Sequence, residues 1–282
     1  MRRAGGFTLI EMIVALVILG ILAAGTTAFI VRSVEGYRDT ARRDQLASTA
    51  RLAAERISRE LRGALPNSVR VSGNCIEFMP LVSGARYQRE TGSYPSGEAI
   101  LALPVSGFSE AASTLDALDL NGDFSQGGFA LAVYPLGPGS GNGDPYASGD
   151  PGVRFPIQSV STSGRPAGVS RVTLIGAHQF SRQSAAQRLF VTRDPVSFCV
   201  LSNGELRRYH DYGVQASQPA PPAGGDLLAE HLPLRDGGGA VQPFRFTAGS
   251  LNRNGLVALD LRFMQNEEWV RIRHDIQLRN VP

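Results

Sequence analysis

A single carboxylate, Glu11, lies near the start of the most apolar stretch of this chain. The 20 residues 12–31 carry no charge and would form a helix about 30 Å long, enough to cross the hydrocarbon core of a bilayer. An acid in lipid normally has a partner. If the chain were cut after Gly6, the new α-amino group of Phe7 would be a cation at almost the same depth. The amino group of an axially shifted neighbour could then pair with Glu11, which would set the stagger of a helical assembly.

The apolar stretch is expected to insert in a membrane, because 11 of its residues are Leu, Ile, Val or Phe and outweigh the one acid. Arg2 and Arg3 precede it, so the positive-inside rule puts the amino terminus in the cytoplasm and the rest of the chain outside. The alternative is an ordinary secretory signal with its exit near Ala23 and Ala24. Against that alternative, the helical pattern continues to about Leu65, and a signal sequence has no use for Glu11.

Cys75 and Cys199 are the only cysteines. The orientation above places both outside the cytoplasm, where disulfides persist. A bond between them would close a loop of about 125 residues, for which the chain-entropy model gives on the order of 5 kcal/mol. The alternative is two separate buried thiols.

A second candidate site has oxygen ligands at alternate positions, Asp119, Asn121 and Asp123, like the start of a calcium loop. The rest of that pattern fails, because Phe124 occupies the glycine position and Ala130 the position of the bidentate glutamate. A polar turn is therefore favoured, a Ca²⁺ site remains the weaker alternative, and no other cofactor is expected.

Catalytic signals are weak along the whole sequence. The four histidines show no paired metal-ligand spacing, and no Gly-x-Ser-x-Gly elbow is present. The chain has no lysine, which excludes a Walker-type phosphate site and a Schiff base. His274 is expected to be a hydrogen-bonded core histidine, and Trp269 to pack in the core or in a hairpin. These observations predict a protein that is not an enzyme.

The charge distribution argues against a nucleic-acid binder. The net charge of +3 arises before residue 66, with ten arginines and six acids, whereas the remainder carries 18 arginines and 19 acids. A nucleic-acid-binding domain would concentrate positive charge on its working face.

The elements that carry these residues follow from hydrophobic periodicity. A helix is expected from about Phe7 to Ala64, and Pro66 ends it. Beyond residue 36 an apolar stripe recurs at spacings of three and four, which predicts a buried face. The stripe consists of Leu46, Ala50, Ala53, Ile57 and Leu61.

After Pro66 the period changes to two. The clearest pattern is residues 257–263 and 270–276 around a polar turn, which predicts an antiparallel hairpin with one buried face. Further strands are expected at 69–71, 76–78, 100–105, 129–134, 172–175, 189–192 and 196–201. Together they predict an α+β fold, with an antiparallel sheet packed on the second half of one long helix and loop-rich insertions. Gly137–Gly152 and Gln215–Gly225 are expected to be surface loops or mobile links.

The run Gly6-Phe7-Thr8-Leu9-Ile10-Glu11, with a basic leader before it and the apolar stretch after it, resembles the processing site of type IV prepilins and type II secretion pseudopilins. The resemblance implies cleavage after Gly6 by prepilin peptidase and N-methylation of Phe7. It also implies that the apolar helix forms the filament core and that Glu11 registers one subunit against the next.

The resemblance implies four segments: a cleaved leader (1–6), a transmembrane and filament-core helix (7–33), an amphipathic stem (34–65) and a β-rich head (66–282). The implied partners are other pilins or pseudopilins through the amino-terminal helix, the prepilin peptidase, the inner-membrane assembly platform and the lipid bilayer, with no nucleic acid. The implied location is the bacterial inner membrane, with the head periplasmic, and later a pilus or the cell surface.

Short segments further along also look like the O-type minor pilins of the MSHA (mannose-sensitive haemagglutinin) pilus system. Such proteins help to start or cap a pilus. The J-type pseudopilin of type II secretion shares the leader and stem and remains the alternative, and an adhesive role for the loops is a third. The segments are 64–70, 75–78, 194–200, 206–209 and 280–282.

Overall fold

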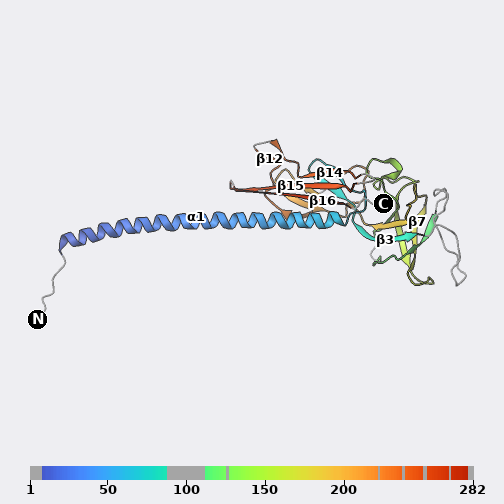
Figure 1. Ribbon diagram of the computed structural model, residues 1–282, viewed down its shortest axis with the longest axis horizontal. Helices are drawn as coiled ribbons and strands as arrows, with labels where there is room; N and C mark the ends of the chain where they lie inside the picture. Colours follow the sequence, from blue (N-terminus) through green and yellow to red (C-terminus); the bar gives the residue numbers. More distant parts are fainter. Residues whose placement is uncertain are drawn as a thin grey trace.

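The computed structural model describes residues 8–87, 112–124, 127–221, 223–236, 239–249, 253–266 and 268–278. One long helix carries a β-rich head on its carboxy-terminal third, and the rest of the helix projects from the head (Figure 1). The expected α+β fold, with a long amino-terminal helix packed against antiparallel sheets, is confirmed.

Helix α1 spans Leu9–Arg62, 54 residues without a proline. It ends where Gly63 donates its backbone N–H to the carbonyl of Glu60, and Pro66 follows. The expected apolar stripe is confirmed, because all five of its residues are buried, together with Ala54 and Ser58.

Two sheets and the stem enclose the main core. The two sheets contact each other through β14 and β1. Helix α1 contacts β16 of one sheet and β11 of the other, so it lies across the open side between the sheets. All three elements contribute side chains to this core, for example Ile57, Phe198 and Leu261. The five-stranded sheet has the order β1 (Arg70–Ser72), β2 (Cys75–Phe78), β9 (Val196–Val200), β10 (Leu206–Tyr209), β11 (Asp226–Ala229); the three-stranded sheet is β14 (Phe244–Thr247), β15 (Leu256–Gln265), β16 (Glu268–Gln277).

The predicted terminal hairpin is confirmed in its register. Val257 lies opposite Ile276, and Phe263 lies opposite Val270, so the apolar residues of both strands share one face. That face turns toward the helix and the core, because β15 and β16 both contact α1.

For the chain between β2 and β9, the sequence predicted further strands and loops of a single sheet. This part of the chain instead forms a six-stranded closed barrel with its own core. Closure of the barrel leaves no unpaired edge. The strands, in barrel order, are β3 (Leu81–Tyr87), β4 (Ala112–Leu118), β7 (Val169–His178), β6 (Arg154–Ser161), β5 (Ala130–Ala132) and β8 (Arg188–Thr192). The strand expected at 100–105 lies outside the described residues. The remaining elements are β12 (Arg235–Asp236), β13 (Gly239–Ala240) and the 3₁₀ turn η1 (Gly141–Gly143).

The loop Gly137–Gly152 is a surface loop in part, as expected, because residues 138–142 and 148–150 are exposed, but residues 143–146 are buried. Tyr146 is buried where the barrel meets the end of the helix, together with Leu65 and Met79. Its hydroxyl donates to the carbonyl of Ser68 at 2.7 Å, and Asp144 orders the turn by accepting from the backbone N–H of Tyr146. One buried aromatic side chain therefore anchors a loop rich in glycine and proline.

Candidate functional site: the exposed apolar half of the helix

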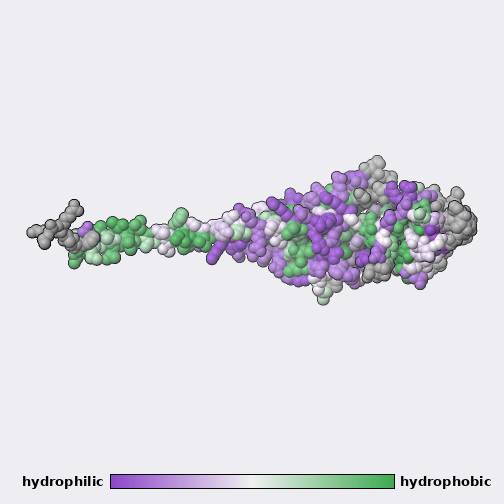
Figure 2. Space-filling view, turned by 90° about the horizontal axis from the view of Figure 1, so that it is seen from below, coloured by the Kyte–Doolittle hydropathy of each residue, from purple (hydrophilic) through white to green (hydrophobic). Residues whose placement is uncertain are grey.

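The amino-terminal half of α1 has no cover within this molecule. Every residue from 8 to 41 is exposed, and the first buried residue of the helix is Leu46. Figure 2 shows the projecting part of the helix as mostly hydrophobic surface. Within the described residues, α1 is the one helix long and apolar enough to cross a membrane. Such a surface needs lipid or other helices around it.

Hydroxyl groups in this half are satisfied inside the helix. Thr26 and Thr27 donate to the carbonyls four residues earlier, Leu22 and Ala23, at 2.7 and 2.8 Å. These bonds remove the cost of exposing the hydroxyls to an apolar environment. The surface around the middle of the span is therefore effectively apolar.

The start of the helix carries the carboxylate. Thr8 is the N-cap, and its hydroxyl oxygen accepts a hydrogen bond from the backbone N–H of Glu11 at 3.3 Å. Glu11 lies in the first turn, where the helix dipole favours a negative charge. Gly6 and Phe7 lie outside the described residues, so the expected cleavage site is inferred from the sequence motif.

Residues 1–27 match the family model described as the prokaryotic N-terminal methylation motif. The amino terminus is that of a type IV pilin-like prepilin. No curated protein and no solved structure matches this chain. The matched motif covers the leader and the start of α1, and for a pilin-like prepilin it implies contact with the prepilin peptidase and the assembly machinery in general. The single apolar helix is consistent with anchoring of this prepilin in the inner membrane.

The two cysteines of the chain meet in the five-stranded sheet. Cys75 on β2 lies directly opposite Cys199 on β9, and the structure joins them in a disulfide across 124 residues of sequence. The barrel is inserted between these two strands, so the bond ties together the two ends of that insertion. Tyr209 belongs to the same buried cluster as the two cysteines.

A buried polar network beside the disulfide could not be identified from the sequence. Glu77 is fully buried, forms an ion pair with Arg70, and accepts a hydrogen bond from the hydroxyl of Tyr212 at 2.8 Å. Burial raises the pKa of Tyr212, so the phenol stays protonated and can donate. Ser197 completes the network with a contact of 2.7 Å to the Tyr212 hydroxyl. The network fixes β2 against β9 and the loop after β10. The one feature of the sequence that could have indicated this network is the charged residue within the short strand 75–78.

The structure places the candidate calcium ligands on the surface. Asp119, Asn121 and Asp123 are exposed, and the side-chain amide of Asn121 donates to the backbone carbonyl of Asp119 at 3.1 Å. Across the described ranges, no group of three or more His, Cys, Asp or Glu residues is arranged to hold a metal ion. A Ca²⁺ site at this turn stays an untested hypothesis.

Of the two expectations for β16, the one for His274 was wrong. Trp269 is 69% exposed and so is outside the core, but it lies opposite Met264 beside the turn of the hairpin, in agreement with the hairpin alternative. His274 is half-buried rather than enclosed, because it faces the seam between β16 and α1. The alternation of the strand was predicted correctly, but it does not tell how far a neighbouring element covers each position.

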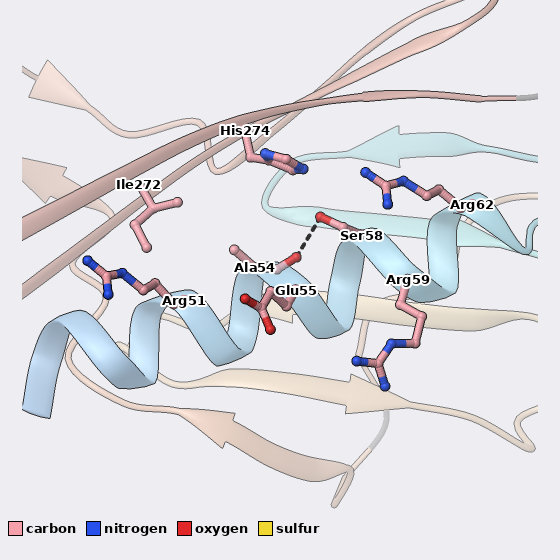
Figure 3. Close-up of a pocket in the computed structure, with 8 residues that line it drawn as sticks. All are labelled: Arg51, Ala54, Glu55, Ser58, Arg59, Arg62, Ile272 and His274. Carbon is pink, nitrogen blue, oxygen red and sulfur yellow. Dashed lines mark hydrogen bonds between the residues drawn. The ribbon is translucent and has the colours of Figure 1, made fainter.

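That seam is an open groove of about 590 Å³ between α1 and β16, which we call the stem–sheet groove (Figure 3). Ile272 and His274 point into it from the strand, and Ala54 and Ser58 face it from the helix. Arg51, Arg59 and Arg62 line it with Glu55.

Proposed function

We propose that this chain is a minor pilin, cut after Gly6, methylated at Phe7 and held in the inner membrane until it is built into or onto the tip of a pilus. The observation that carries the proposal is the exposed apolar half of α1, with Glu11 near its start and a folded head at its other end. The protein is structural, and its mechanism is assembly.

The physical basis is a change of surroundings for one surface. In the bilayer the apolar half of α1 gains little from meeting another apolar helix, because lipid tails are equally apolar. An ion pair between Glu11 and the amino terminus of a neighbour favours one relative position of the two helices, because charges interact strongly in that environment. Once a filament leaves the membrane, neighbouring helices must cover the surface that lipid covered before.

The MSHA-type assignment has support from the placement of the segments that carry the resemblance. Four of them, scattered in sequence, meet at the five-stranded sheet: the segment 64–70, which leads into β1, and the neighbouring strands β2, β9 and β10. They surround the disulfide and the buried network at Glu77. A J-type pseudopilin of type II secretion is the competing assignment, because it shares the leader and stem.

The test is to shear filaments from cells, identify the companions of this chain by mass spectrometry, and determine its amino terminus. We expect a chain that begins with methylated Phe7 and co-purifies with pilins; companions from a secretion machine would support the pseudopilin instead. A mature chain that begins at Met1, or after Ala24, would falsify the proposal.

A further inference from the structure

The stem–sheet groove carries a net positive charge, because three arginines line it with one carboxylate, Glu55. Among the described residues, Arg51, Arg59 and Arg62 take part in no ion pair. Other stem arginines do: Arg43 pairs with Glu268, and Arg56 with Glu60. Arg59 and Arg62 are in the last turn of α1, where the helix dipole favours cations, but Arg51 is about three turns from the end.

Between Arg51 and Arg62 the groove has an apolar strip, beside the polar side chains of Glu55, Arg59 and His274. Ala54 and Ile272 face it from opposite sides, and the hydroxyl of Ser58 is already used in a hydrogen bond to the carbonyl of Ala54 at 2.6 Å. In Figure 3, Arg51 and Arg62 lie toward opposite ends of the drawn helix segment. Charge at the two ends and an apolar centre define the chemistry of what fits.

We propose that the stem–sheet groove binds an extended acidic segment of a neighbouring subunit, an inference that rests on the proposed function. Arg51 and Arg62 are 11 residues apart, about 16 Å along the helix. In an extended chain, positions one and five are about 13 Å apart and share a face with position three. The long side chains of Arg51 and Arg62 can lean toward each other to cover the remaining distance. The groove therefore selects carboxylates at positions one and five, with a small apolar residue at position three.

Two other anionic partners fit the groove less well. Lipid headgroups are too far away, because Arg51 follows the end of the uncharged span by 20 residues, about 30 Å, whereas the Debye length is about 8 Å at physiological salt. A nucleic acid would bring closely spaced phosphates next to Glu55 on the same groove and would find little to stack on.

The test uses the full chain in detergent micelles and a fluorescein-labelled peptide, Asp-Ser-Val-Ser-Asp, followed by fluorescence anisotropy. We expect saturable binding that weakens with salt. Arg51→Glu and Arg62→Glu should each weaken binding about five-fold or more. Arg38→Glu is the matched control, because Arg38 is also exposed on α1 but lies about 20 Å from Arg51 along the helix; it should change binding less than about two-fold. Circular dichroism checks that each variant is folded.

Four results would overturn the inference. The peptide could fail to bind, Arg38→Glu could weaken binding as much as the groove variants, or a peptide of the same composition with adjacent aspartates could bind equally well. Tighter binding of a single-stranded oligothymidylate by the same arginines would also overturn it, because the groove would then be a polyanion site. None of these results bears on cleavage after Gly6 or on recovery in filaments, so a failure here is distinguishable from a failure of the proposed function.

Discussion

The hydroxyl oxygen of Thr8 accepts a hydrogen bond from the backbone N–H of Glu11, and this contact starts the helix. Thr8 and Glu11 also have the spacing of a capping box, in which the side chain three residues after the cap supports the same turn. Glu11 therefore suits the start of its own helix, and under the proposed function it has a second, separable role as a charge offered to a neighbour.

Substitutions at Glu11 separate the two roles. Glu11→Gln keeps a side chain that suits a capping box but removes the charge, whereas Glu11→Ala removes both. If the charge registers subunits, both variants should insert and be cleaved normally but should appear in sheared filaments several-fold less than the wild type, as measured by immunoblot. Normal incorporation of Glu11→Gln would assign the residue to helix capping alone.

Gly6→Leu tests the cleavage site. The bulky side chain is expected to block the peptidase and leave an uncut precursor in the membrane, which amino-terminal sequencing would detect as a chain that begins at Met1. Glu11→Ala is the control, because it should be cut. Recovery of Gly6→Leu with Phe7 as its first residue would contradict the assignment.

The disulfide should contribute strongly to the stability of the head. The double variant Cys75→Ala with Cys199→Ala loses a link that closes about 125 residues, so the free energy of unfolding should fall by up to about 5 kcal/mol in denaturant titrations. Reduced wild-type protein should unfold at nearly the same denaturant midpoint as the double variant. If the oxidised wild type and the double variant unfolded together, the bond would contribute nothing.

The stem should be integral to the core of the head. Leu61 is 1% exposed, and Leu61→Ala should lower the free energy of unfolding by about 2–5 kcal/mol, because it leaves a cavity between the helix and both sheets. Leu52→Ala is the matched control, since Leu52 is 67% exposed on the same helix; it should change stability by about 0.5 kcal/mol or less. Equal effects would mean that the stem does not pack on the sheets.

His178 should make the barrel sensitive to acid. Its ring is buried, stacks on Phe155 at 4.3 Å and lies 3.3 Å from an Asp150 oxygen, and burial lowers its pKa below the ordinary 6.5 despite that carboxylate. The unfolded chain then takes up a proton before the folded one does, so stability is complete above pH 6.5 and falls as the pH drops toward the folded pKa.

The variant His178→Phe removes this titration. Its melting temperature should depend less steeply on pH between about 6.5 and 5 than that of the wild type, whose His178 contributes at most about 1.4 kcal/mol per pH unit. The difference between the two slopes is the measurement, because other groups titrate in both proteins. Identical slopes would show that His178 protonates equally in the folded and unfolded chains.

Patterns with a local physical cause were predictable. The uncharged run 12–31, the stripe from Leu46 to Leu61 and the alternation at 257–263 each depend on residues that are near one another in sequence. The exposure of Trp269 and of His274 was not predictable, because it depends on which distant element covers one end of a strand.

The sequence by itself determined a membrane-length helix with Glu11 near its start, an amphipathic stem and a strand-rich remainder, because helix and strand periods fix which residues share a face. The tertiary structure alone decided that six strands between Leu81 and Thr192 close into a barrel, that Tyr146 anchors a glycine-rich loop and that Arg51 and Arg62 flank an open groove. These features depend on pairing between strands far apart in the chain, and pairing is set by the packing of the whole molecule rather than by any local pattern.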